Sequence, residues 1–170
     1  MKGMAVYMKL KRIVSGLLLS ALIAVTASSC GQSVTVDVEV AADTLYRNIT
    51  FEDTMEPMDS SMLSSIYSDI QSDDVVKCKV YVSSTATAEE IAVFEAKDSA
   101  AASRLETIVN TRVQEQKDIY ADYAPLEVSR LEKAVIRKEG NYLFFCVAAD
   151  KDKVESEIDA LFYRTDSKSL

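Results

Sequence analysis

The chain has 170 residues, of which 48% are hydrophobic and 27% charged, with only 4 Gly and 2 Pro. These values predict one folded domain with a real core and argue against a disordered chain. The net charge of −8 disfavours nucleic acid, so we expect no nucleic-acid partner. The chain contains no histidine, the commonest general base and metal ligand. We therefore expect no catalytic residue, no metal site and no cofactor.

The first 29 residues have the order of a secretory signal peptide. Basic residues at positions 9–12 precede an apolar run at 13–27, and small residues follow at Ala27, Ser28 and Ser29. The apolar run is shorter than the roughly 20 residues that span a bilayer, which favours a signal peptide over a membrane-spanning helix. We predict a signal peptide at residues 1–29 with Ala27, Ser28 and Ser29 flanking the cleavage point. Both Met1 and Met8 remain open as the first translated residue.

Cys30 directly follows these small residues, and this tail resembles the lipobox of bacterial lipoproteins. In such proteins the cysteine is diacylated and becomes the mature N-terminus. The resemblance implies lipid attachment at Cys30, a tether at residues 30–39 and a location at the cell membrane, facing the extracytoplasmic side. Two acyl chains give stable anchoring. Lipoboxes usually carry an aliphatic residue such as Leu where this chain has Ala27. Because Ala27 and Ser29 also suit an ordinary signal peptidase, simple secretion stays as an alternative.

Residues 40–163 are predicted to form a single α+β domain, followed by a polar tail at 164–170. Apolar residues at helical spacing predict a short amphipathic helix at 38–49. Residues 50–58 are expected to be irregular. Asp59 is then expected to cap a second short helix.

Four later segments have the pattern of β-strands: 75–83, 91–97, 134–137 and 142–149. The first alternates apolar residues with Lys and Tyr, which predicts one buried face and one wet face. The second and fourth are apolar on both faces, which places them in the middle of a sheet. The sequence Gly140-Asn141 predicts a tight turn between the last two strands.

A long helix is predicted from about residue 100 to 120, capped by Asp98 or Ser99. Its apolar stripe is expected to comprise Ala102, Leu105, Val109, Val113 and Tyr120. Pro125 is well placed as the first residue of another short helix. A last helix follows Asp150 or Asp152, and its inward residues are expected to be Val154, Ile158, Leu161 and Phe162.

The order of elements is therefore strand-strand-helix, a short linking helix, and strand-strand-helix again. This order predicts an α+β fold with a four-stranded antiparallel sheet of two β-hairpins. We expect the strands in the order 1-2-4-3, both main helices on one face, and short N-terminal helices partly covering the other face.

Several short motifs also resemble a known family: residues 90–98, 123–125, 131–134 and 140–142. They resemble an uncharacterised domain-of-unknown-function family of Gram-positive bacterial lipoproteins, over about residues 40–162. The resemblance implies a lipid-anchored location outside the membrane. It supplies no activity and no catalytic residues.

Three groups of residues carry the remaining chemistry. Glu89 and Glu90 are adjacent carboxylates of the kind that glycosidases use as a catalytic pair. Because the chain has no Trp to bind a sugar ring, we expect both residues to lie in a solvated turn instead. The pair Ser83-Ser84, with Lys77 or Lys79 as the base, is the alternative nucleophile. Cys78 and Cys146 lie mid-strand among apolar residues, so we expect buried, unreactive thiols. A disulfide between them stays open as the alternative, and it would contradict the predicted strand order.

These features favour a non-enzymatic binding or accessory domain at the cell envelope. Its expected partners are the membrane, through the lipid anchor, and an envelope protein or a cell-wall component. Two alternatives stay open: a small membrane-tethered hydrolase that uses carboxylates or a Ser–Lys pair, and a simply secreted binding domain.

Overall fold

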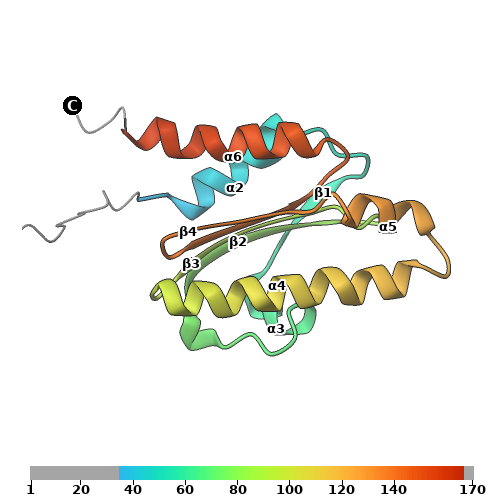
Figure 1. Ribbon diagram of the computed structural model, residues 1–170, viewed down its shortest axis with the longest axis horizontal. Helices are drawn as coiled ribbons and strands as arrows, with labels where there is room; N and C mark the ends of the chain where they lie inside the picture. Colours follow the sequence, from blue (N-terminus) through green and yellow to red (C-terminus); the bar gives the residue numbers. More distant parts are fainter. Residues whose placement is uncertain (1–34, 167–170) are drawn as a thin grey trace, which may run out of the picture. The chain divides into compact units, whose positions relative to one another are not determined.

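The computed structural model describes residues 35–166, which form a sheet covered by helices on both faces (Figure 1). The predicted signal peptide, Cys30 and the first half of the tether, residues 30–34, lie outside the described residues. The helices are α2 (Val38–Asn48), α3 (Leu63–Ile66), α4 (Ser99–Tyr120), α5 (Pro125–Leu131) and α6 (Lys151–Asp166). The strands are β1 (Met55–Met58), β2 (Val75–Ser83), β3 (Glu90–Ala96), β4 (Val135–Glu139) and β5 (Tyr142–Val147). Short 3-10 turns at Ser60–Met62 and Ser72–Asp74 flank α3.

The sheet is antiparallel throughout, and its strands have the order β1-β2-β3-β5-β4. The four strands expected from sequence are present as neighbours, and every residue of β5 is buried, as expected for an inner strand. The prediction of four strands is wrong, because β1 adds a fifth strand beside β2.

Strand β1 lies in the segment that we expected to be irregular. It has only four residues, and Pro57 interrupts them, so neither its length nor its composition indicates a strand. The Ser84 amide donates to the Thr54 carbonyl at 2.9 Å. Because hydrogen-bonded pairs alternate in an antiparallel ladder, the residues on either side of Pro57 bond to β2, while the Pro57 nitrogen faces away from it. The missing N–H of Pro57 therefore costs the sheet no hydrogen bond.

The helices divide between the two faces, which corrects our prediction of two main helices on one face. Helix α4 lies on one face with α3, and α6 lies on the other with α2 (Figure 1). Strands β3 and β5 carry large apolar side chains on both faces, so each face must be covered. Among these, Val93 and Phe144 point toward α2 and α6, while Phe94 and Phe145 point toward α4.

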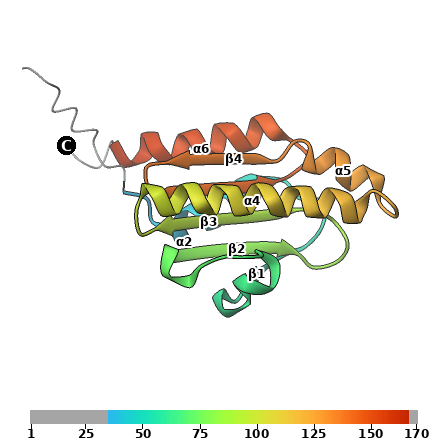
Figure 2. The same ribbon diagram turned by 60° about the horizontal axis from the view of Figure 1, so that its bottom comes forward.

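Helix α4 runs along the middle of its face, between β4 and β2 (Figure 2). The Asp98 carboxylate caps it by accepting from the Ala101 amide at 2.7 Å. Its buried stripe comprises Ala101, Ala102, Leu105, Val109 and Val113. The prediction is confirmed at Ala102, Leu105, Val109 and Val113, whereas Tyr120 is only half-buried and Ala101 was not predicted.

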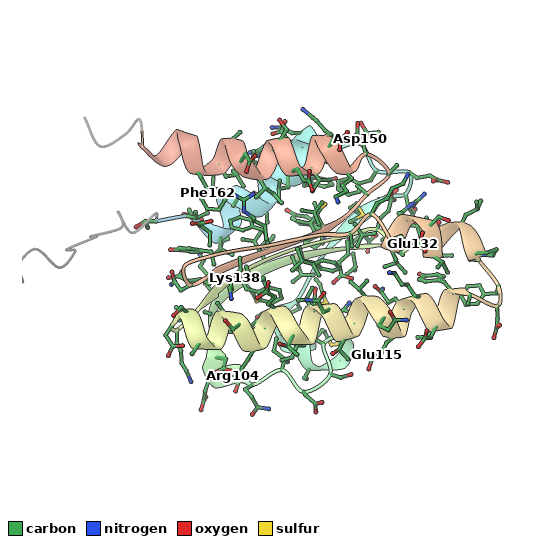
Figure 3. All side chains as sticks on the ribbon, viewed as in Figure 1. Arg104, Glu115, Glu132, Lys138, Asp150 and Phe162 are labelled. Atoms are coloured by element: carbon green, nitrogen blue, oxygen red, sulfur yellow. The ribbon has the colours of Figure 1, made fainter. Side chains whose placement is uncertain are left out.

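Helix α6 begins after Asp150, whose carboxylate accepts from the Lys153 amide at 3.0 Å. Val154, Ile158 and Leu161 are buried, as predicted. The Phe162 ring points from α6 toward the sheet (Figure 3), and its centroid lies 5.3 Å from that of Phe144. The helix continues to Asp166, so residues 164–166 are helical, whereas we assigned them to the tail.

The domain also begins earlier than residue 40. Val36 and Val38 are buried in the core with α2, although we assigned both to the tether. The Asp37 carboxylate accepts from the Glu39 and Val40 amides and caps α2. Among the helices of residues 35–166, none is both long and apolar enough to cross a membrane.

Candidate functional site

The sequence-predicted site residues Ala27, Ser28, Ser29 and Cys30 all lie outside the described residues. The other candidates are two buried ionic networks around Glu90 and Glu89, a hydroxyl–carboxylate contact at Ser83, and the two described cysteines. An open groove also lies along β2.

Glu90 is buried in the first network, which corrects our prediction of a solvated turn. Its side chain is 1% exposed and accepts hydrogen bonds from Arg112 of α4, with Nη2 to Oε2 at 2.7 Å. The Tyr67 hydroxyl donates to Oε1 of the same carboxylate. Burial and the neighbouring Glu90 charge raise the pKa of Tyr67 well above its usual range, so this hydroxyl keeps its proton. The network joins α4 to β3 and leaves the Glu90 carboxylate committed to structural partners.

Glu89 is buried in the second network, on the loop that leads into β3. Its carboxylate accepts from the amides of Glu52 and Asp53 at 2.9 Å. Nη1 of Arg130 lies 3.2 Å from the Glu89 carboxylate and 3.4 Å from that of Glu127. The Glu127 carboxylate also accepts from the Ala88 amide at 2.7 Å. These contacts hold the turn between β2 and β3 against the segment before β1. The role of Glu89 is therefore structural.

Ser83 is held by a carboxylate. Its hydroxyl donates to Asp53, which also accepts from the Thr85 hydroxyl. These hydrogen bonds lower the pKa of Asp53 to about 2. The Lys77 ammonium lies instead beside α2, 3.5 Å from the Glu39 carboxylate. The geometry of Ser83 therefore supports a turn-stabilising role better than a Ser–Lys nucleophile.

The two described cysteines are free and lie on opposite faces of the sheet. Cys146 is fully buried among the residues under α2 and α6, and Cys78 packs partly against the α4 side. Burial raises the pKa of both thiols. Cys146 fits the predicted buried, unreactive thiol, whereas Cys78 is only half-buried.

Cys78 lines an open groove of about 690 Å³, which we call the edge groove. One wall is the N-terminal half of β2, and the other is the segment containing α3 and its flanking 3-10 turns. The lining side chains bear a hydroxyl, aliphatic, amide or thiol group, and one is a cation: Ser60, Ser61, Leu63, Ser64, Ile70, Gln71, Ser72, Val75, Val76, Lys77 and Cys78. This lining suits a ligand that combines apolar groups with neutral hydrogen-bonding groups.

The β2 wall of the groove is an unpaired strand edge. The Ser83 amide donates to the Glu89 carbonyl at 3.1 Å, toward β3. Since alternate residues of an antiparallel strand bond to opposite neighbours, the backbone N–H and C=O of Cys78 point away from β3. Strand β1 ends at Met58, which pairs with Val80, so β1 does not reach Cys78. The groove therefore contains a backbone donor and acceptor without a strand partner.

The edge groove was not predicted from sequence. Its residues come from two segments whose approach depends on the early end of β1 and on Tyr67, which ties the α3 segment to Glu90. The local signal is weak, consisting of the serines at 60–65 and a strand that is less buried in its first half than β3.

Within the described residues, no group of three or more Cys, Asp or Glu side chains is arranged to hold a metal ion.

Comparisons with known proteins identify a family but no activity. No curated protein and no solved structure matches the chain. Residues 47–148 match the domain of unknown function DUF4358. This segment contains all five strands together with α3, α4 and α5, and more than half of the chain. The chain therefore belongs to the DUF4358 family.

Proposed function

We propose that this protein is a lipid-anchored lipoprotein on the extracytoplasmic face of the cell membrane. Its domain is a non-enzymatic binding module for a partner in the cell envelope, and the edge groove is its binding site. The observation that carries the proposal is the combination of Cys30, placed directly after a signal-type segment, with an open groove whose β2 backbone is unpaired.

Two features support binding over catalysis. The buried carboxylates of Glu89 and Glu90 are each used by structural partners. The edge groove is lined by serines, aliphatic side chains and one lysine, without a carboxylate among them. Such a lining favours recognition by shape and hydrogen bonding.

The anchor is tested by labelling with radioactive palmitate in cells that express the full chain. The native chain and the Cys78→Ser variant are expected to carry label and to partition into detergent, whereas Cys30→Ser loses both properties. If the native chain is exported without label, the protein is simply secreted and the anchor is wrong.

The binding site is tested with a matched pair of substitutions on α3. Ser64 lines the edge groove, while the neighbouring exposed Ser65 does not. Cross-linking in intact cells is expected to give the same adduct for the native chain and for Ser65→Trp, and to lose it for Ser64→Trp, because the indole fills the groove. An adduct that survives equally in both variants places partner binding elsewhere.

A further inference from the structure

We infer that the edge groove binds an extended polypeptide segment, which pairs with β2 opposite Cys78 as an added antiparallel strand. This inference rests on the proposed binding function and names the class of its ligand. The segment carries an apolar residue opposite Cys78 and acidic residues on either side of it.

The backbone of β2 favours a polypeptide as the class of ligand. Cys78 presents one N–H and one C=O away from β3, beyond the end of β1 at Met58. An extended peptide supplies a donor and an acceptor at the spacing of a strand, and strand addition is a recurring mode of peptide binding. A sugar or a small organic molecule has no such regular spacing.

The side chains around Cys78 specify which kind of peptide residue lies opposite it. Cys78 faces the groove side of the sheet, next to Leu63 and Ile70 of its lining. Residues directly opposite each other in an antiparallel pair point to the same face. The residue opposite Cys78 therefore enters the groove, where aliphatic and thiol groups receive an apolar side chain.

The neighbours of that residue point to the other face, where lysines lie. The Lys77 side chain is 43% exposed, and its ammonium contacts the carboxylates of Asp37 and of Glu39 in α2. The Lys79 ammonium lies 5.2 Å from the Tyr81 ring centroid. Acidic side chains flanking the apolar one are placed beside these two ammonium groups. The net charge of −8 disfavours a longer acidic tract, so the preference is confined to the flanking positions.

The edge is also limited in length. The pairing of β2 with β3 is irregular between Val75 and Lys77, and a bulge of this kind together with lysines protects an edge against indiscriminate pairing. Only Lys77–Lys79 lie between this bulge and the first residue that pairs with β1. The added segment is therefore short, and its affinity is modest.

Cys78 reports occupancy of the groove directly. The full chain, purified in detergent, is treated with N-ethylmaleimide, and labelling of Cys78 and Cys146 is followed by mass spectrometry. The probe is the blocked peptide Thr-Val-Glu-Val-Glu-Val-Thr, whose central Val is meant to lie opposite Cys78. We expect it to slow Cys78 labelling at least fivefold at concentrations up to about 1 mM, a weak-binding range.

Two control peptides isolate the backbone and the charge. A peptide that is N-methylated at the central Val keeps the side chains but loses the donor to the Cys78 carbonyl, and it should not protect. Replacing both Glu residues with Lys should weaken protection. In the chain, Ser64→Trp should remove protection and Ser65→Trp should keep it.

Equal protection by the N-methylated peptide would overturn strand addition, and so would no protection by the parent peptide. Protection by a cell-wall glycan fragment and by neither peptide would also overturn it, while leaving the binding module in place. Failure of palmitate labelling, with peptide protection intact, would reject the anchor and leave this inference standing.

Discussion

Arg112 in α4 donates to both oxygens of the buried Glu90 carboxylate, from Nε to Oε1 at 3.3 Å and from Nη2 to Oε2 at 2.7 Å. Its Nη1 donates to the carbonyl oxygen of Ile66 at 2.8 Å, at the end of α3. The guanidinium also lies over the Tyr67 ring, 5.1 Å from its centroid. One cation therefore fixes β3, α4 and the wall of the edge groove relative to one another.

Arg112→Met is expected to lower the free energy of unfolding by about 3–5 kcal/mol, because it leaves the Glu90 carboxylate buried without its counter-charge. The double variant with Glu90→Gln should recover at least about 1 kcal/mol, since the two sites are coupled. Arg137→Met, at a half-exposed pair with Asp159, is the control and should cost less than about 1 kcal/mol. Urea unfolding measures all three, and equal costs for the two single variants would refute the role of Arg112.

Asp53 makes stability depend on pH in the acid range. Its pKa is about 2 in the folded protein against an ordinary value of 3.8, mainly because the Ser83 and Thr85 hydroxyls donate to it. A depressed pKa contributes stability above the unfolded value, and the contribution disappears as the pH falls through the folded value. We expect Asp53→Asn to lower the urea midpoint at pH 6 and to approach the native midpoint toward pH 2. Ser83→Ala should remove part of the same difference. Parallel pH profiles for the native chain and Asp53→Asn would contradict this.

The two described thiols should react at very different rates. Cys78 is half-buried and lines the edge groove, whereas Cys146 is fully buried. N-ethylmaleimide should modify Cys78 in the folded chain and Cys146 only after unfolding in urea. Because burial raises the pKa of Cys78 above its ordinary value of 9.0, its labelling rate should rise roughly tenfold per pH unit through pH 9. A rate that levels off near pH 8 would show a thiol that is not desolvated.

Helix α6 should be essential although it lies outside the segment that matches DUF4358. Ile158 is 1% exposed and packs on the sheet face that carries Phe144. Ile158→Ala should cost about 2–5 kcal/mol through lost burial and the remaining cavity. Ser156→Ala, at an exposed position of the same helix, should stay within about 0.5 kcal/mol. If chemical denaturation gives equal stabilities for these variants, α6 contributes little to the core.

Much of the secondary structure was predictable because its signals are local. Asp98 before a run at helical spacing, and Gly140 in a tight turn, where its φ is 59°, were identified from neighbouring residues alone. Strand β1 was not predictable, because Met55–Met58 becomes a strand only by pairing with β2. The Glu89–Glu90 pair was misjudged for a similar reason: Arg112 and Arg130, which make its burial tolerable, lie far along the chain.

The amino-acid sequence by itself determined the positions of most helices and strands and the apolar character of β3 and β5. The tertiary structure alone decided that α4 and α6 cover opposite faces, that Glu89 and Glu90 are internal, and that β1 stops short of Cys78 to leave an open edge. The physical reason is the distance along the chain over which each kind of interaction acts. Hydrophobic periodicity and capping act over a few residues, whereas the side of a sheet on which a helix packs and the partner of a buried charge depend on contacts between distant segments.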